Sequence, residues 1–237
     1  MKKFLAIVAT ASLALSALAA APYYIAGDFN GWNAAGNLMT ETFSGSGIWQ
    51  ATLNTGTGRH EFKVTDGTWN WNYPGPNSWL YADSGGNVTI TYDVNTYADG
   101  WSATSQRIGL STDPGSWTAT GNFQVAAGEG SDWNNAAGNM TAVGGGIYKY
   151  TLTVPGTWDW KPVVTGTPTW DSISWDNRSV GTANWQFTLA AGDQANLYVN
   201  AFAGTAKVEI VPIPEPSALA LLGCGVAAGL CWLRRRQ

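Results

Sequence analysis

The sequence predicts an all-β protein in which two tandem β-sandwich domains stand between two terminal targeting segments. Three observations lead to this prediction. Short β-rich runs bounded by Gly, Asn, Asp and Pro dominate residues 22–213, and periodic runs of helix formers are missing there. The chain also repeats itself with a period near 100 residues. Both ends carry an apolar stretch next to basic residues.

The N-terminus has the features of a secretory signal peptide over residues 1–19. Lys2 and Lys3 precede an apolar stretch, and small residues stand three and one positions before the expected cleavage after Ala19. We therefore expect about residues 20–213 to fold outside the cytoplasm.

Composition narrows the possible partners of the exported part. It keeps 7 of the 12 Lys and Arg and 15 of the 16 Asp and Glu, which gives a net charge of −8. An acidic surface repels phosphate backbones, so nucleic acid is not an expected partner. Cys224 and Cys231 lie in the C-terminal apolar stretch, so the exported part is expected to be stable without disulfides.

Sequence repeats divide the exported part into two domains. Three segments recur in the same order without gaps: residues 27–40, 47–53 and 58–63 match 128–141, 146–152 and 156–161. A period of this length is typical of tandem domains rather than of a solenoid. We expect domain one over about 22–110 and domain two over about 121–211, joined by a linker at 111–116.

Alternation of apolar and polar residues predicts the central strands of each domain. Residues 49–53, 59–64 and 148–152 alternate, so that one face of each strand is buried. Turn sequences at 54–58 and 154–156 connect them to the following strands as hairpins.

Each domain then continues into a Trp-rich segment and a closing strand. The Trp-rich segments, at 68–84 and 167–184, are also rich in Gly, Pro and polar residues and are expected to be loops. The closing strands are expected at 87–92 and 196–200.

Domain one resembles the starch- and glycogen-binding modules over its whole length. A Gly-Asp-Phe-Asn-Gly-Trp-Asn motif at 27–33 is followed by Met39, Gly-x-Trp at 47–49, Glu-Phe-Lys-Val at 61–64 and Asp-Gly-Thr-Trp at 66–69. Such modules accompany branching and debranching enzymes, pullulanases and the β subunit of AMP-activated kinase. The resemblance implies immunoglobulin-like early-set sandwiches that bind α-glucans. Domain two resembles them less, because Glu-Gly-Ser-Asp replaces the Asp-Phe-Asn-Gly sequence.

The resemblance also implies a sugar site in each domain. Sugar rings have apolar C–H faces and a rim of hydroxyls, so they suit flat aromatic platforms flanked by a few polar groups. The family's site positions correspond in domain one to Trp32, Lys63, Trp69 and Asn87. In domain two they correspond to Trp133, Lys161, Trp170 and Asn196.

Structural roles are the alternative for many of these residues. Trp49, Trp158 and Trp160 occupy strand positions and are expected in the core. Trp32 and Trp133 are equally compatible with plugging the end of a sandwich, and Lys63 and Lys161 with an outward, solvated position. The rings in the polar loops are favoured as sugar contacts: Trp69, Trp71, Tyr73, Trp79, Trp170 and Trp175.

Catalysis and metal binding find little support, so we expect neither an enzyme nor a cofactor. His60 is the only histidine, which excludes a metal site that needs several His or Cys. Asp171 and Asp176, with Asp132 or Asp159, could bind calcium, but scattered loop aspartates are usually solvated. Paired carboxylates for glycoside hydrolysis depend on distances that the sequence does not contain.

The C-terminus combines a motif, an apolar run and a basic tail. Pro214-Glu215-Pro216 precede the uncharged run 217–233, whose 17 residues are just enough for a transmembrane helix. The final arginines, expected in the cytoplasm by the positive-inside rule, are Arg234, Arg235 and Arg236. This arrangement over 214–236 resembles the PEP-CTERM sorting signal of Gram-negative bacteria. The resemblance implies processing by exosortase, a membrane-embedded cysteine protease, and transfer to the cell surface. A plain membrane anchor is the alternative.

Two functions follow as hypotheses. The first is an exported, non-catalytic surface protein that binds an α-glucan or the cell's own exopolysaccharide through both domains. The second is a structural matrix or adhesion protein of the cell envelope that kept the sandwich and lost the sugar site.

Overall fold

The computed structural model describes residues 22–174, 178–180 and 183–213. The expected signal peptide at 1–19 and the expected transmembrane helix at 217–233 lie outside the described residues. Within the described ranges, no helix is long and apolar enough to cross a bilayer. Apart from the 3₁₀ turn η1 (Asp28–Asn30), the regular structure there consists of β-strands, which confirms the all-β prediction.

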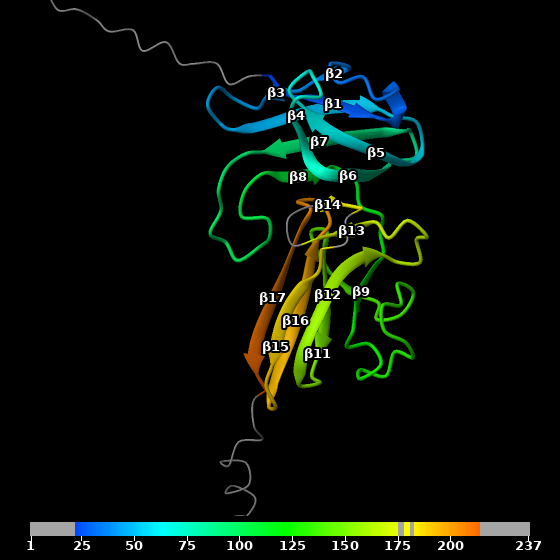
Figure 1. The fold of residues 1–237 in the computed structure, drawn as a ribbon, viewed down its shortest axis with the longest axis vertical. Helices are drawn as coiled ribbons and strands as arrows, with labels where there is room; N and C mark the ends of the chain where they lie inside the picture. The colour runs from blue at the N-terminus through cyan, green and yellow to red at the C-terminus, as the bar shows by residue number, and fades with distance from the viewer. Residues whose placement is uncertain (1–21, 175–177, 181–182, 214–237) are drawn as a thin grey trace, which may run out of the picture.

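The first half of the chain forms two antiparallel sheets (Figure 1). One has the order β2 (Asn37–Leu38), β1 (Tyr24–Gly27), β5 (Gly58–Thr65) and β6 (Asn72–Ala82). The other has the order β3 (Thr40–Glu41), β4 (Ile48–Asn54), β7 (Asn87–Asp93) and β8 (Arg107–Leu110).

The second half forms two further antiparallel sheets. In one, β12 (Gly156–Val164) pairs with β9 (Trp117–Gly121), β13 (Ser172–Ile173) and β15 (Trp185–Leu189), and β13 pairs with β14 (Arg178–Ser179). The other has the order β10 (Thr141–Gly144), β11 (Ile147–Leu152), β16 (Asp193–Asn200) and β17 (Thr205–Pro212). The first strand of this half, β9, begins before the expected domain boundary at residue 121.

Two hydrophobic cores correspond to the two halves, and each collects side chains from two sheets. The first includes Ile25 and Phe62 from one sheet and Trp49 and Ile90 from the other. The second contains Trp117, Trp160, Tyr148 and Leu197, and Trp158 packs against it as a partly buried ring. Burial of such a side chain contributes about 1.5–3 kcal/mol. The core positions predicted for Trp49 and Trp160 are confirmed.

Strand β6 is a departure from the prediction, because residues 68–84 were expected to be a loop. Its sequence contains Pro74 and Pro76, which cannot donate to a strand ladder. The ladder with β5 skips them, since Phe62 pairs with Ser78 and Val64 pairs with Tyr73. This irregularity removes the prolines from the ladder and allows a strand where the composition favours a loop.

The repeat is visible in backbone geometry as well as in sequence. The N–H group of Trp32 donates to the carbonyl of Gly27 at 2.8 Å, and that of Trp133 donates to the carbonyl of Gly121 at 3.1 Å. A Cβ atom on either glycine would lie within 2.7 Å of a backbone oxygen of the neighbouring strand. The counterpart of Gly27 is therefore Gly121 and not Gly128, and the second half carries seven extra residues before its tryptophan.

The two halves are docked through β6, rather than merely linked. Trp79 on β6 is fully buried and belongs to the core of the second half. Its Nε1 donates to the carbonyl of Ser172 at 3.0 Å, and Ser78 Oγ donates to the carbonyl of Arg178 at 2.7 Å. Trp79 was expected to be a sugar-contacting loop residue, and that expectation is wrong because β6 turns the ring into the other half's core.

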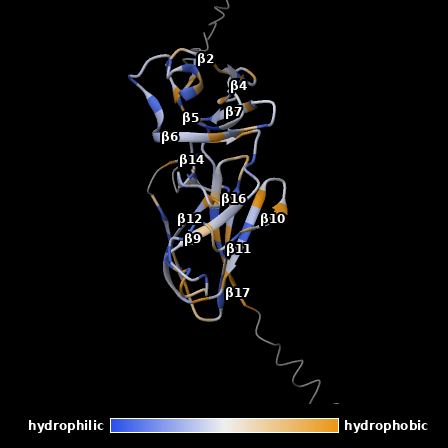
Figure 2. Cartoon of the chain, turned by 90° about the vertical axis from the view of Figure 1, so that its right-hand side faces the viewer, coloured by the Kyte–Doolittle hydropathy of each residue, from blue (hydrophilic) through white to orange (hydrophobic). Residues whose placement is uncertain are grey.

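Both views show the halves stacked along the long axis of the molecule (Figures 1 and 2). The described chain begins in the upper half and ends after β17 at the opposite end of the lower half. The segment 94–106, between β7 and β8, extends from the first half alongside the second.

Candidate functional site

The rings of Trp32 and Trp69 lie together at one edge of the first half. Their centroids are 6.4 Å apart and their planes are tilted by 44°. Trp32 follows the turn after β1, whereas Trp69 lies in the turn between β5 and β6. The side chain of Trp69 is 46% exposed and Trp32 is partly buried. The structure thus brings two of the predicted platform residues together on an accessible surface.

Unusual backbone conformations single out the predicted tryptophans. Among the residues that the structure describes, the non-glycine residues at positive φ are Trp32 (60°), Gln106 (57°), Trp133 (56°) and Trp170 (55°). An L-residue in this region costs roughly 1–2 kcal/mol, and Gly or Asn would cost less. Strain of this kind clusters at functional sites. Three of these four residues were proposed as sugar platforms from the sequence.

Lys63 holds the backbone beside this surface. Its Nζ donates to Asn72 Oδ1 at 3.1 Å, to the carbonyl of Pro74 at 2.6 Å and to the carbonyl of Gly75. An ammonium group has three donors, and these three acceptors match them. Burial lowers the pKa of Lys63. Lys63 therefore orders the start of β6 next to Trp69 and is not the freely solvated side chain that its outward strand position suggested.

Asn87 lies away from the two tryptophans. It begins β7, its Oδ1 accepts a hydrogen bond from Asn54 Nδ2 at 3.1 Å, and its backbone N–H donates to Asp83 Oδ1 at 2.7 Å. These partners lie at the turns near Gly58, where β5 begins, whereas Trp69 follows the end of β5. The four positions predicted for domain one do not converge on one point.

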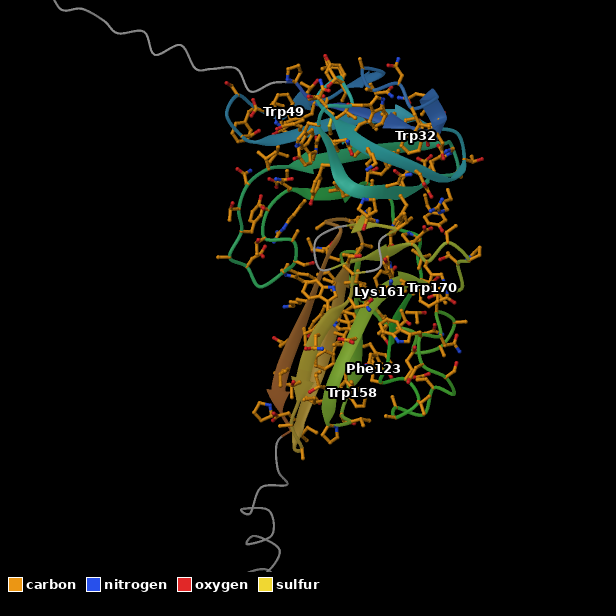
Figure 3. All side chains as sticks on the ribbon, viewed as in Figure 1. Trp32, Trp49, Phe123, Trp158, Lys161 and Trp170 are labelled. Carbon is orange, nitrogen blue, oxygen red and sulfur yellow. The ribbon has the colours of Figure 1, made fainter. Side chains whose placement is uncertain are left out.

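In the second half, Lys161 and Trp170 come together (Figure 3). Lys161 Nζ lies 5.7 Å from the centroid of the Trp170 ring, within the range of a cation–π contact. Lys161 is buried, and burial lowers its pKa. Trp133 has the same backbone turn as Trp32. Lys161 is therefore packed inside the structure and does not occupy the outward, solvated position that was the alternative expectation.

Asn196 is buried in the other sheet of the second half. Its Oδ1 accepts a hydrogen bond from Thr151 Oγ1 at 3.1 Å. Register shows that it is not the counterpart of Asn87. Ile48 pairs with Asp93 in the first half and Ile147 pairs with Asn200 in the second, so the position of Asn87 corresponds to Gln194.

Two other rings that were expected in the loops pack against a core. Trp71 and Tyr73 are partly buried and pack against the first core. Trp175 lies outside the described residues. Of the rings predicted to contact sugar from the loops, Trp69 is the most exposed that the structure describes, and Trp170 is partly exposed.

Asp171 has a structural role that sequence reasoning missed, because the residue was considered only as a loop ligand for calcium. It is fully buried. Arg59 donates to it from Nε and Nη2 at 2.7 and 2.6 Å, and the Tyr81 hydroxyl donates at 2.7 Å. In the described part of the chain, no three His, Cys, Asp or Glu side chains form a group suited to a metal ion. Asp171 instead joins the two halves.

Comparison with known proteins identifies the C-terminal segment. Residues 212–236 match the PEP-CTERM protein-sorting motif, which confirms the prediction for 214–236. A search of curated proteins gave no match.

Two solved structures are similar to the chain over much of its length. SusF from Bacteroides thetaiotaomicron has 16% sequence identity and a TM-score of 0.34, over 83% of this chain and 50% of SusF. Pullulanase from Bacillus acidopullulyticus has 11% identity and a TM-score of 0.28, over 79% of this chain and 28% of the pullulanase. The chain spans half or less of either protein, and TM-scores this low lend neither protein's activity to it.

Proposed function

We propose that this chain is an exported, non-catalytic protein that binds an uncharged polysaccharide, an α-glucan or the cell's own exopolysaccharide. The exposed pair formed by Trp32 and Trp69 is the observation that carries the proposal. Two tilted rings offer flat apolar surface to successive sugar faces. Asn33 and Asn70, each next to one of the tryptophans, are exposed and supply amide groups for sugar hydroxyls.

The fold supports this proposal. The four sheets group into two pairs, each with its own core, and we infer that these pairs are two tandem immunoglobulin-like sandwiches of the early-set type. The second half keeps the strained turn at Trp133 and the contact between Lys161 and Trp170. Its predicted platforms Trp133 and Trp170 are only partly exposed, whereas Trp69 is 46% exposed, so we assign the main polysaccharide contact to the first half.

The position of the pair suits a protein held by its C-terminus. Trp32 lies on the upper half, whereas the described chain ends at the far end of the lower half, next to the sorting motif (Figures 1 and 3). A chain held to the envelope at that end would direct the tryptophan pair outward.

The binding proposal is tested by co-sedimentation of the full chain with insoluble starch and with purified exopolysaccharide. Trp69→Ala should weaken binding about fivefold or more, because a lost stacking ring costs on the order of 1 kcal/mol. Phe43→Ala is the matched control, since Phe43 is a 68% exposed ring elsewhere on the first half. Equal binding by wild type and Trp69→Ala would exclude the pair as the site.

A structural matrix or adhesion protein without sugar binding is the second candidate. The positions of Asn87 and Asn196 favour it, because each lies apart from the other site residues predicted for its half and does not join the converging set that the family resemblance implied. Failure of the wild-type chain to sediment with either polysaccharide would establish this candidate instead.

Sorting is proposed to follow from the C-terminal motif. The chain would be exported by its signal peptide, held briefly by the C-terminal segment in the membrane of a Gram-negative bacterium, and cleaved by exosortase for transfer to the surface. Mass spectrometry of the surface fraction should then find a chain without the apolar run and without Arg234 to Arg236. An intact chain ending at Gln237 would contradict processing and favour a permanent membrane anchor.

A further inference from the structure

A cleft of about 600 Å³ lies where the segment 94–106 meets the second half. Four aromatic rings line it: Tyr73, Tyr97 and Trp101 from the first half and Trp185 from the second. Its volume is in the range of sites that bind small molecules. The cleft is separate from the pair formed by Trp32 and Trp69, neither of which lines it.

The wall formed by 94–106 has a fixed shape although it contains no strand or helix. The Tyr97 hydroxyl donates to Asp93 at 2.5 Å, and the Tyr97 backbone N–H donates to the carbonyl of Thr104 at 2.7 Å. The Arg107 guanidinium lies 4.2 Å from the Tyr97 ring centroid and forms two hydrogen bonds of 2.8 Å to Asp99. A ligand would therefore meet a preformed wall and would lose little affinity to ordering it.

Docking against the second half completes the cleft. The Trp101 and Tyr198 ring centroids are 6.3 Å apart, and Lys207 Nζ lies 5.0 Å from the Trp101 ring. Ser102 and Ala206 exchange two hydrogen bonds, of 2.9 and 3.0 Å. These contacts fasten Trp101 and Ser102 to the second half, which also supplies Trp185.

The lining indicates the chemistry of the ligand. None of the described residues that line the cleft is charged, so the lining itself offers an ion no charged partner in place of its hydration shell. Polar groups come from hydroxyl and amide side chains: Ser102, Thr104, Ser105 and Gln106. Aromatic rings with uncharged donors and acceptors between them suit a molecule that has apolar faces and a hydroxyl rim. Gln106 is also the fourth non-glycine residue at positive φ, which places backbone strain at this cleft too.

We propose that this cleft is a second carbohydrate site, which takes a short segment of an uncharged oligosaccharide between Trp101 and Trp185. The inference rests on the proposed polysaccharide function and adds a site that is formed jointly by the two halves. Two rigidly spaced sites on one chain would raise the apparent affinity for a long polysaccharide without a flexible linker.

The test uses indole N–H signals of the full chain in detergent micelles, observed by nuclear magnetic resonance. Trp69→Phe, Trp101→Phe and Trp185→Phe assign three of the signals. The probes are maltoheptaose, cellohexaose and laminarihexaose, added in turn. At least one probe should shift the Trp101 and Trp185 signals in a saturable manner.

A blocking variant locates the effect. Ala98 is exposed and lines the cleft, so Ala98→Phe should weaken the response of Trp101 and Trp185 about tenfold and leave the Trp69 response unchanged. Ala190→Phe, at an exposed alanine outside the cleft, is the control and should change neither response.

Each other outcome contradicts the proposal in a distinct way. A shift of the Trp69 signal alone would overturn the second site and leave the proposed function intact. No shift at Trp69, Trp101 or Trp185 with any probe would overturn both. A response of Trp101 and Trp185 that survives Ala98→Phe would show that the sugar binds elsewhere.

Discussion

At the scale of single residues, the backbone at the tryptophans is more informative than their number. Trp32 and Trp133 share a positive φ and the same hydrogen bond to a glycine carbonyl. Local preference would select Gly or Asn at such a position. A tryptophan at such a position therefore indicates a role for the indole ring that outweighs the backbone strain. For Trp32, that role is the exposed contact with the Trp69 ring.

Replacement of Trp32 by Asn distinguishes the contribution of the strained backbone from that of the indole ring. Asn tolerates the left-handed region, so relief of about 1 kcal/mol of strain should offset most of the lost ring packing. We expect Trp32→Asn to change the free energy of unfolding by less than about 1 kcal/mol and to weaken polysaccharide binding about fivefold. Urea unfolding and co-sedimentation measure the two quantities. A loss of several kcal/mol with unchanged binding would show that Trp32 plugs the end of the fold.

At the scale of elements, the junction between the halves depends on β6 and on the segment around β13. Arg59, Tyr81 and the buried Asp171 form a charged network across it. The Arg178 guanidinium lies 4.6 Å from the Trp79 ring centroid and is fully buried. Desolvation lowers the pKa of Arg178 to about 9, and the nearby Asp113 and Asp171 carboxylates act in the opposite direction. We therefore expect this junction to couple the unfolding of the two halves.

Removal of the Asp171 carboxylate should weaken the whole chain. Asp171→Ala leaves Arg59 and the Tyr81 hydroxyl without their shared acceptor, so the free energy of unfolding should fall by about 3 kcal/mol. Asp99→Ala removes an ion pair whose carboxylate side chain is 42% exposed, and should cost below about 1 kcal/mol. Urea denaturation of the three proteins compares them. Equal costs for the two variants would mean that the junction contributes no more than a surface ion pair.

At the scale of the whole molecule, the two halves are docked against each other through side-chain and backbone contacts. The contacts across the junction include the core position of Trp79 and the paired hydrogen bonds of Ser102 and Ala206. A chain docked in this way would present the two proposed binding surfaces at one separation, so we do not expect the linker at 111–116 to set their effective concentration.

High pH should destabilise the folded protein through the ionisation of its buried tyrosine hydroxyls. Burial, and then hydrogen bonds to Asp113 and Glu129, raise the pKa values of Tyr148 and Tyr150 to about 12. These folded values exceed the unfolded value of about 10, so the stabilisation is complete below pH 10 and is lost as the pH rises towards about 12.

The double variant Tyr148→Phe, Tyr150→Phe separates the tyrosine effect from that of the buried lysines Lys63 and Lys161. The lowered pKa values of these lysines make the fold more stable, not less, as the pH rises towards 10.5. Between about pH 9 and pH 11.5, the wild-type free energy of unfolding should decline more steeply than that of the Tyr148→Phe, Tyr150→Phe protein. Urea unfolding across this range provides the slopes. Parallel slopes would show that these two hydroxyls do not titrate differently in the folded and unfolded chains.

The sequence by itself determined the features that depend on neighbours along the chain. Alternation located the strands that contain residues 49–53, 59–64 and 87–92, because one buried face needs a period of two. The sorting motif could also be recognised from the sequence, because its three parts follow one another directly along the chain. The resemblance to starch- and glycogen-binding modules implied that Trp32 and Trp69 belong to one site, and the structure places their rings 6.4 Å apart.

Only the tertiary structure decided the roles that depend on distant partners. Trp79 became a core residue, and Asp171 an acceptor for Arg59, through contacts that span about 90 to 110 residues. Lys63 is not the solvated residue that its strand position suggested, because the irregular pairing of β6 with β5 places three acceptors around its ammonium group. The cleft beside Trp185 exists only once the halves are docked, since each supplies one of its walls. Burial and hydrogen bonding depend on which segments meet in space. The local sequence pattern does not say which distant segment supplies the packing or hydrogen-bonding partner of a residue.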